Sequence, residues 1–371
     1  MKHIISAKYK CFVFFIEIFM VILLLPVFYN YISIDKNTPT TFYIPSSNLD
    51  DIVHTLEKNG YTVTLIDKLM LTFIESPQKG WYHVDHEEYG RLRFFATLHN
   101  KKTETMDIVI YAGETAEELI TRLSKDMKLD KVILQEKYKM LTRFQEADIF
   151  AKRYSIARKA NEEVTIQYLF DLSNAQLSKF EKDNFTQKPD TLTLKVLLTI
   201  ASIIQKESNS VKEMPLISSV IHNRLDKGMK LQMDSTLNYG KHSHVVVTPE
   251  RIKSDMSYHN TYKHKGLPPY PLGTVTLDAL KAAMSPQKSD YLFFMLDPKG
   301  GHNFTATYDK HLENIRAFRV YQKERAEQKK SEAIQKKKAE AKKQKKAKKE
   351  EKAKLKKDTN KTLDTNTSKS S

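Results

Sequence analysis

The 371-residue sequence contains a single cysteine and a single tryptophan. Because one thiol cannot form an intramolecular disulfide, and Cys11 lies within an apolar N-terminal run, the rest of the chain must be stabilised by burial alone. Metal-ligand patterns are also scarce: there is no cysteine pair and no HExxH motif, and the pair His242 and His244 is of a kind that is more often solvated than ligating. We therefore expect neither a metal nor a cofactor.

Basic residues are abundant but unevenly placed. The net charge is +16, and residues 322–371 hold 19 Lys or Arg against 8 Asp or Glu, so the remaining body is nearly balanced. A nucleic-acid-binding domain needs basic residues interleaved with aromatics on one face, so this distribution argues against nucleic acid as a partner. Residues 322–371 contain almost no apolar side chains. We expect them to form a solvated helix or a disordered tail, with disorder in the final TNKTLDTNTSKSS.

The N-terminus has the pattern of a membrane segment. Residues 11–31 are apolar apart from Glu17, and no small-residue cleavage site follows them. The preceding lysines are Lys2, Lys8 and Lys10. We predict a single-pass anchor in the cytoplasmic (inner) membrane, with residues 1–10 in the cytoplasm and the chain after Tyr31 on the periplasmic or outer side. A cleaved secretion signal is the alternative, and it too would export the rest of the chain.

A small α+β region is expected at residues 40–138. The segment TTFYIP predicts a strand, Ser46-Ser47-Asn48 a helix cap, and LDDIVHTLEKNGY a helix. A second strand at Met106–Tyr111 and a helix at Ala116–Met127 repeat this order. Trp81 in this region could stack on a sugar ring, although a lone tryptophan in a small domain is more often a core residue.

The most informative stretch is an apolar helix that ends near an acid. Residues Leu192 to Ile204 are apolar at nearly every position, which predicts a helix buried on most faces, and Glu207 is the acid near its C-terminal end. Apolar surroundings and the negative end of the helix dipole both favour the protonated carboxyl group. A general acid for glycosidic bond cleavage needs that form. A glutamate at a helix end is more often a solvated surface group, so this position alone is ambiguous.

The residues after Glu207 add context. Ile217 to Leu225 predicts a helix closed at Gly228, and the alternating stretch that follows would place Gln232, Asp234 and Thr236 on one side of an extended segment. Further along the chain we expect a short strand at Val245–Val247, a helix at Leu277–Met284 and a buried strand at Tyr291–Leu296. Several further blocks follow in the sequence: HNTY, GLPPYPLG, LKAAMSP and GGHNFTATYDKH. Together with ASIIQKES and NRLDKGMKLQMDSTLNY, these blocks resemble the endolytic murein transglycosylase (YceG-like) family, in the family's order over about 120 residues.

The resemblance implies an α+β chain with a transmembrane helix at 11–31, a LysM-like module at 40–138, a mixed α/β catalytic domain at 139–321 whose buried helix bears the catalytic Glu207, and the tail at 322–371. It implies glycan contacts by Gln232, Asp234, Ser235, Thr236, Tyr239, Asn260, Thr261, Tyr262, His302 and Phe304. One departure concerns the segment before the catalytic helix, where EEVTIQYLFDLS replaces the family's usual pattern. Around it we expect a helix at 144–160 and the start of a strand at 160–172.

The activity implied by the resemblance is that of a lytic transglycosylase, a lyase. It would cleave the β-1,4 bond between N-acetylmuramic acid and N-acetylglucosamine within peptidoglycan strands, leaving 1,6-anhydro ends and terminating nascent strands. Glu207 would act first as acid and then as base. Two alternatives remain open: a muramidase-type hydrolase that uses Glu207 and Asp234, and a non-catalytic glycan-binding scaffold. The expected partners are peptidoglycan strands, the membrane and peptidoglycan synthases.

Overall fold

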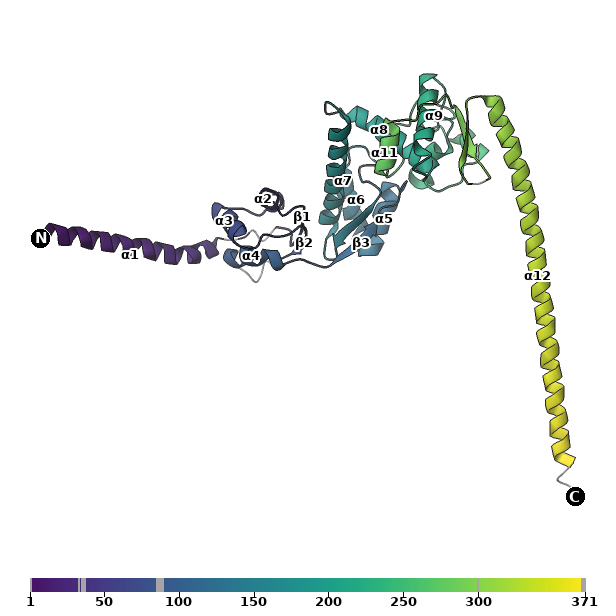
Figure 1. The fold of residues 1–371 in the computed structure, drawn as a ribbon, viewed down its shortest axis with the longest axis horizontal. Coiled ribbons are helices and arrows are strands. Elements are labelled where there is room, and N and C mark those ends of the chain that lie inside the picture. The colour runs from purple at the N-terminus through teal and green to yellow at the C-terminus, as the bar shows by residue number, and fades with distance from the viewer. Residues whose placement is uncertain (1, 33, 35–37, 85–89, 299, 368–371) are drawn as a thin grey trace. The chain divides into compact units, whose positions relative to one another are not determined.

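The computed structural model describes residues 2–32, 34, 38–84, 90–298 and 300–367. The chain divides into two compact units, Met1–Gln287 and Lys288–Ser371, which are described one at a time (Figure 1). Both contain helices and antiparallel strand pairs, which confirms the predicted α+β class. The elements of the first unit are α1 (Lys2–Tyr31), β1 (Thr41–Ile44), α2 (Leu49–Lys58), α3 (Leu65–Phe73), β2 (Gly80–His83), α4 (Arg91–Thr97), η1 (Leu98–Asn100), β3 (Thr105–Val109), α5 (Ala116–Met127), α6 (Lys131–Leu141), β4 (Arg153–Ala157), α7 (Glu162–Asn184), α8 (Thr191–Glu207), α9 (Met214–Asp226), η2 (Asp234–Leu237), η3 (Gly240–His242), α10 (Pro249–Ser254) and α11 (Leu277–Met284).

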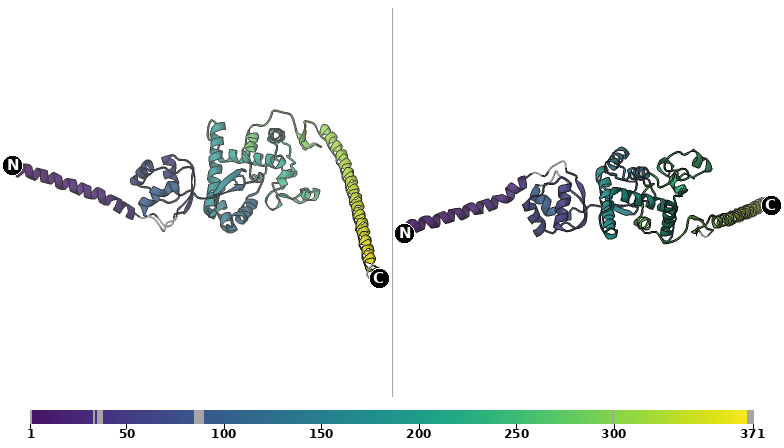
Figure 2. Two further views of the ribbon diagram at one scale, coloured as in Figure 1. Left: turned by 60° about the horizontal axis from the view of Figure 1, so that its bottom comes forward. Right: turned by 90° about the horizontal axis from the view of Figure 1, so that it is seen from above.

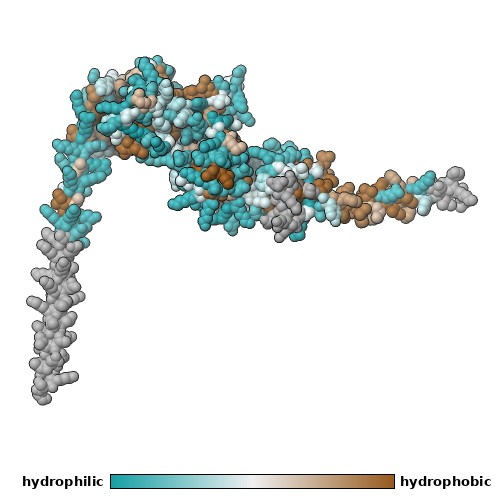
Figure 3. Space-filling view, turned by 180° about the vertical axis from the view of Figure 1, so that it is seen from behind, coloured by the Kyte–Doolittle hydropathy of each residue, from teal (hydrophilic) through white to brown (hydrophobic). Residues whose placement is uncertain are grey.

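Helix α1 contains the predicted N-terminal apolar segment. Its stretch Tyr9–Tyr31 is long and apolar enough to cross a membrane and has none of its hydrophobic window buried in the protein. Figure 3 shows apolar side chains along this helix. The helix begins at Lys2 and so includes residues that precede the predicted anchor at 11–31.

A strand–helix–helix–strand unit follows α1. Strands β1 and β2 pair antiparallel, with Tyr43 opposite Trp81, and α2 and α3 lie between them in the sequence. Asn48 caps α2 as predicted, and Thr64 forms a capping box with Asp67 at the start of α3. The apolar faces of these elements and α4 meet in one core: Phe42, Ile44, Ile52, Val53, Leu56, Tyr61, Leu71, Tyr82, Val84, Phe94, Phe95 and Leu98.

The same order of elements occurs a second time. Strand β3 pairs antiparallel with β4, and α5 and α6 lie between them in the sequence. Because β4 lies beyond Tyr138, the predicted module boundary passes between two elements that share one sheet. The helix predicted at 144–160 is wrong, since this stretch is a series of bends followed by β4. Buried Asp148 accepts hydrogen bonds from Arg143 N and Phe144 N (3.1 Å each), so the loop has its own partners for these amides.

Trp81 joins the two strand–helix–helix–strand units. It belongs to β2, yet it is only 3 % exposed and packs in the core of the second strand–helix–helix–strand unit. Its ring centroid lies 4.6 Å from that of Tyr168. Its Nε1–H donates to Ser155 O at 2.7 Å, which satisfies the indole donor. The interpretation of Trp81 as a core residue is therefore confirmed.

The remaining helices of the first unit form the surroundings of Glu207. The strand predicted at 160–172 is wrong: this stretch starts α7, whose Asn161 cap accepts from Val164 N (3.0 Å) and whose first turn holds two glutamates. Helix α8 packs against α9 and α11, and α11 spans Leu277–Met284 as predicted. Residues 245–247, predicted as a short strand, belong to a loop, and Val246 is 81 % exposed.

The second unit contains a strand pair and one long helix. Strands β5 (Phe293–Leu296) and β6 (His302–Thr305) pair antiparallel, and α12 runs from Tyr308 to Thr367. Strand β5 is half-buried, whereas its continuous apolar run had predicted a fully buried strand. Helix α12 is uninterrupted (Figure 2), so the expected helix is found. The disorder predicted for the final residues is contradicted up to Thr367, where the helix ends. Residues 368–371 lie outside the described residues.

Candidate active site

Helix α8 ends at Glu207, as the sequence predicts. Asp190 starts the helix by accepting a hydrogen bond from Thr193 N at 2.7 Å. Its second half is buried on most faces. The buried residues there are Leu198, Thr199, Ile200, Ala201, Ser202, Ile203, Ile204 and Gln205. Glu207 itself is half-buried, so its side chain lies at the border between the core and the solvent.

The last turns of α8 are fixed by hydrogen bonds to the segment that precedes α11. Ser202 Oγ accepts from Leu272 N at 2.9 Å. The side chain of Gln205, which is 4 % exposed, accepts from both the amide (3.2 Å) and the hydroxyl (2.7 Å) of Thr276. Since Thr276 is also the N-cap of α11, these bonds connect two helix ends. Glu207 therefore follows directly from a rigid, fully packed turn.

The segment after α9 brings Asp234 and Ser235 to Glu207. The amide of Ser235 donates to Glu207 Oε1 at 3.4 Å, a long hydrogen bond at the start of η2. Tyr262 donates from its hydroxyl to Asp234 Oδ1 at 2.7 Å. The pKa of Tyr262 is raised above its usual value, mainly by burial, then by the hydrogen bond and charge of Asp234, and further by the charge of Glu207. These four residues therefore lie close together at the end of α8.

The prediction that Gln232, Asp234 and Thr236 share one side of an extended segment is wrong. Gln232 and Asp234 are exposed, but Thr236 is fully buried because the chain turns into a 3₁₀ helix at Asp234. The Thr236 hydroxyl lies 2.9 Å from that of Thr261 and donates to Met233 O at 2.7 Å. Gln232 has φ of 50°, a left-handed conformation that marks the sharp entry into this turn.

Asn260 and Thr261 are buried beneath the cluster. Asn260 is 0 % exposed and donates to the carbonyls of Ile252 and Asp255, at 2.8 Å each, while its Oδ1 accepts from Tyr262 N at 3.1 Å. Thr261 Oγ1 accepts from Met233 N at 3.2 Å. In this structure both side chains have hydrogen-bond partners within the protein, so they position Tyr262 and the start of η2.

Tyr239 belongs to an aromatic stack that the sequence did not indicate. Its ring lies parallel to His259, with centroids 3.9 Å apart, and Tyr270 meets the same imidazole edge-on at 4.4 Å. His259 is 3 % exposed, and burial lowers its pKa to about 4, so the ring is neutral at physiological pH. The stack connects the HNTY block to the GLPPYPLG block.

The other two predicted contacts, His302 and Phe304, lie in the second unit. Both are half-buried residues of β6, and their rings lie 5.4 Å and 5.7 Å from that of Phe294 on β5. Their predicted contact with glycan therefore stays a prediction.

Three charged residues, Arg224, Glu146 and Lys206, have structural roles that the sequence analysis missed. Arg224, 8 % exposed, hydrogen-bonds Leu231 O and so holds the strand-like stretch before η2. Burial raises the pKa of Glu146 to about 8, and burial likewise lowers the pKa of Lys206. Glu146 Oε2 accepts from Ala116 N at 2.7 Å, and Lys206 Nζ donates to Ser243 Oγ at 3.2 Å. Lys206 precedes Glu207 and could have been noticed as a lysine on a buried helix.

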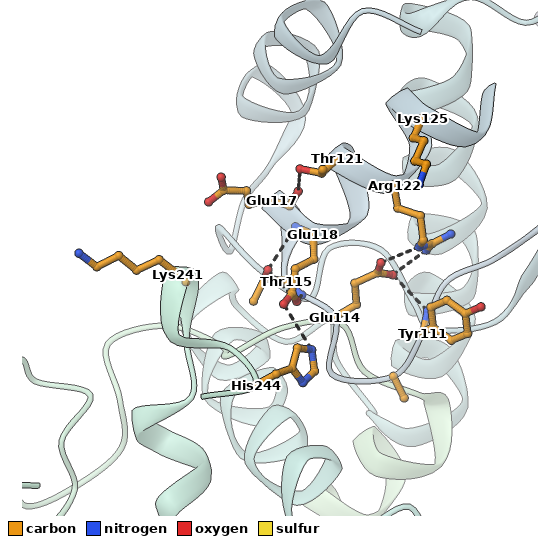
Figure 4. A pocket seen from close by; sticks show the side chains of 12 residues that line it. Tyr111, Glu114, Thr115, Glu117, Glu118, Thr121, Arg122, Lys125, Lys241 and His244 are labelled. Carbon is orange, nitrogen blue, oxygen red and sulfur yellow. Dashed lines mark hydrogen bonds and ion pairs between the residues drawn. The ribbon is translucent and has the colours of Figure 1, made fainter. Parts of the chain in front are cut away.

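A pocket of about 800 Å³ lies between α5 and the loop around η3 (Figure 4). Two polar pairs lie on its walls: Arg122 donates to both carboxylate oxygens of Glu114 (2.8 and 2.7 Å), and His244 Nε2 lies 3.3 Å from Glu118 Oε1. Glu207 is not among the lining residues, so the chemistry predicted for Glu207 belongs to the cluster and not to this pocket. Across the described ranges, no group of three or more His, Cys, Asp or Glu side chains is placed to hold a metal ion.

Three comparisons place the chain among known proteins. The endolytic murein transglycosylase of Bacillus subtilis (strain 168) is 34 % identical over 148 residues, which are 39 % of this chain and 40 % of that protein. The protein of the same name from Streptococcus pneumoniae serotype 2 (strain D39 / NCTC 7466) is 33 % identical over 177 residues, 46 % of this chain and 31 % of that protein. The chain thus spans less than half the length of the curated relatives it matches. A crystal structure of a YceG-like protein from Listeria monocytogenes superposes with a TM-score of 0.47 at 24 % identity, covering 74 % of this chain and 97 % of that one.

The family comparison covers most of the chain. The model of the YceG-like family matches residues 42–317, from β1 into the first turns of α12, and so includes the whole Glu207 cluster. The chain therefore belongs to the YceG-like family.

Proposed function

We propose that this protein is an endolytic lytic transglycosylase that cleaves the β-1,4 bond between N-acetylmuramic acid and N-acetylglucosamine in peptidoglycan. The observation that carries the proposal is the cluster at the end of α8, where the half-buried Glu207 meets Ser235 N and the Asp234–Tyr262 pair. The names of the matched relatives, each an endolytic murein transglycosylase, support the same reaction.

One carboxyl group is enough for this reaction. Protonated Glu207 gives its proton to the glycosidic oxygen as the bond to muramic C1 breaks, which leaves a free 4-hydroxyl on the departing glucosamine. The resulting carboxylate then takes the proton of the muramic C6 hydroxyl, whose oxygen bonds to C1. Glu207 ends protonated, the product is a 1,6-anhydro sugar, and no water is consumed.

Asp234 supports the groove in this mechanism and does not act as a nucleophile. Its Oδ1 already accepts the Tyr262 hydroxyl at 2.7 Å, and a carboxylate oxygen that accepts a strong hydrogen bond is a weaker nucleophile. The alternative is a muramidase-type hydrolase in which Asp234 attacks C1 or activates water. The other alternative is a scaffold without catalysis.

Product analysis separates these functions. Purified full-length protein is incubated with sacculi, and soluble fragments are measured by mass spectrometry. A lytic transglycosylase leaves anhydro ends, whereas a hydrolase leaves reducing ends that are heavier by one water. No soluble fragments would support the scaffold. Internal cleavage predicts long fragments early in digestion, whereas an enzyme that acts from strand ends releases disaccharides first.

The rest of the chain is assigned to delivery of this site. α1 is proposed as a single-pass anchor in the cytoplasmic membrane, with the N-terminus inside and the site outside. Residues 40–138 are proposed as a LysM-like glycan-binding module, and the strand–helix–helix–strand order of 41–83 supports this. Gln232, Asp234, Ser235, Tyr239, Tyr262, His302 and Phe304 are proposed glycan contacts. Peptidoglycan synthases are proposed as partners, because strand cleavage near the membrane acts on newly made glycan.

A further inference from the structure

Helix α3 exposes a row of large apolar side chains. Leu65 is 79 % exposed, Leu69 55 % and Phe73 84 %, and their spacing of four residues puts them on one face of the helix. The opposite face is fully packed, by Asp67 and Leu71. On the neighbouring helix α4, Leu92 is 41 % exposed. A small domain that lies free in water rarely presents such a row, so the α3 face calls for an occupant.

The buried side of α3, opposite this face, contacts the end of α1. Tyr29, in the last turn of α1, is 3 % exposed, and its hydroxyl donates to Asp67 Oδ1 on α3. Asn30 Oδ1 accepts from Leu92 N on α4 at 3.1 Å. Figure 1 shows both helices beside this end of α1. The neighbouring Phe28 of α1 is 68 % exposed, so apolar surface of α1 continues up to the point of contact.

The contact is rigid because a buried ion pair supports it. Asp67 and Arg91 are both 0 % exposed in their side chains and meet at 2.5 Å, and Arg91 also donates to Thr62 O at 2.5 Å. Asp67 further accepts from Thr64 N at 2.5 Å. With its oxygens thus bonded from α1, α3 and α4, Asp67 fixes the end of α1 to the α3–α4 corner.

We propose that the α3 face, defined as Leu65, Leu69 and Phe73, docks on the lipid bilayer beside α1. This rests on the proposed role of α1 as a membrane anchor. The apolar segment Tyr9–Tyr31 has 23 residues and is about 35 Å long at 1.5 Å per residue, against a hydrocarbon core of about 30 Å. Its last turn therefore lies at the headgroup level, and α3, whose Asp67 is bonded to that turn, lies near the same depth with the α3 face exposed.

The chemistry of the corner favours lipid over a protein partner. Apolar side chains at the headgroup boundary bury in the acyl region, and Lys68 on α3 and the exposed Arg93 on α4 suit anionic headgroups. The exposed Phe28 also brings apolar surface of α1, which lipid would surround, close to this corner. The α3 face then gives the first strand–helix–helix–strand unit a second membrane contact and holds it at a fixed orientation on the bilayer.

Site-specific fluorescence in liposomes tests this. Cys11→Ser removes the natural thiol, and single cysteines are introduced by Phe73→Cys on the α3 face, Met20→Cys in α1 and Leu192→Cys on α8, which is 67 % exposed at the start of that helix. Each full-length variant is labelled with an environment-sensitive dye and reconstituted in phosphatidylethanolamine–phosphatidylglycerol vesicles. Circular dichroism checks folding. We expect the labels at 73 and 20 to shift to the blue and to be quenched by spin labels on lipid tails, and the label at 192 to be quenched only by aqueous iodide.

Three results would overturn the proposal. A label at 73 that behaves like the one at 192, while the label at 20 is quenched by lipid, overturns the docking and leaves the anchor intact. Labels at 20 and 73 that both escape lipid quenching overturn the anchor and the docking with it. A label at 73 that is shielded from iodide but not quenched by lipid shows that protein covers the face. If the unlabelled wild type releases no anhydro fragments from sacculi, that result counts against the proposed reaction and does not affect the fluorescence result.

Discussion

At the scale of single residues, Glu207 carries the proposed chemistry. Glu207→Gln keeps the shape of the side chain and its bond from Ser235 N but cannot transfer a proton. We expect turnover of sacculi to fall by about 10²- to 10⁴-fold while sacculus binding and the melting temperature stay near wild type. The measurement is release of anhydro fragments over time. Glu250→Gln, an exposed acid on α10, serves as the matched control. Wild-type turnover in Glu207→Gln would remove this residue from the mechanism.

Asp234 and Tyr262 should act as one unit because one hydrogen bond joins them. Asp234→Asn and Tyr262→Phe are each expected to lower turnover about three- to tenfold, the worth of one hydrogen bond of about 1 kcal/mol. The double variant should lose little more than either single one, as a double-mutant cycle would register. All three should still give anhydro ends. Trapping of a covalent sugar on Asp234 would establish the hydrolase instead.

Glu146 should make stability depend on pH. The folded protein keeps this carboxyl group protonated up to about pH 8, whereas the unfolded chain releases the proton near 4.5. The folded state therefore holds more protons between these values, and stability falls as the pH rises through this window. Glu146→Gln should lose this contribution, so its melting temperature relative to wild type should rise by at least about 3 °C between pH 4.5 and pH 8. Parallel curves for the two proteins would contradict the buried, protonated state of Glu146.

The residues of the cluster were predictable to different degrees. Glu207, Asp234, Ser235 and Tyr262 stand in recognisable blocks, and the structure brings them together. Thr236, Asn260 and Thr261 stand in the same blocks but point inward, and a motif does not tell which of its polar residues are buried. Arg224 was missed because its role comes from a tertiary contact, to Leu231 O. His259 stands in the HNTY block, but its packing against two tyrosine rings also depends on tertiary structure and could not be read from that block.

At the scale of elements, periodicity predicted the long helices well and the region between them poorly. Helices α8 and α11 have strong apolar patterns, and their ends were found within a few residues. Residues 144–160 also look helical, but β3 provides a strand partner far away in sequence and Asp148 satisfies the loop amides, so β4 forms instead. For α7 the capping signal at Asn161 was present and outweighed by the β-branched residues after it.

Helix α12 leads to a prediction about adhesion. Residues 322–340 of the helix are exposed, and Ile334 is the only large apolar side chain among them. Deletion after Tyr321 should reduce sacculus binding at low salt, with little difference at high salt, because screening removes exposed charge attractions. Turnover of soluble glycan strands should not change. A drop in that turnover would mean that the removed part of α12 supports the catalytic fold.

At the scale of the whole molecule, the proposed anchor would determine the compartment of the site. If α1 spans the membrane with its N-terminus inside, the lysines of α12 lie outside, where a protease can reach them. Trypsin added to cells stripped of their wall should shorten the protein from its C-terminal end and leave an N-terminal epitope intact until the membrane is permeabilised. Protection of α12 under these conditions would reverse the proposed orientation.

Trp81 can serve as an intrinsic fluorescence probe of how the protein is packed. As the only tryptophan of the sequence, it lies between the two strand–helix–helix–strand units, and its Nε1–H donates to Ser155 O. Indole emission depends on polarity, so the steady-state spectrum of the unmodified protein reports a single event: whether β2 and β4 remain together. A red shift without loss of helical circular dichroism would mean that the units part while each stays folded. A separation of these two units on glycan binding or membrane attachment would thus be detected without any label.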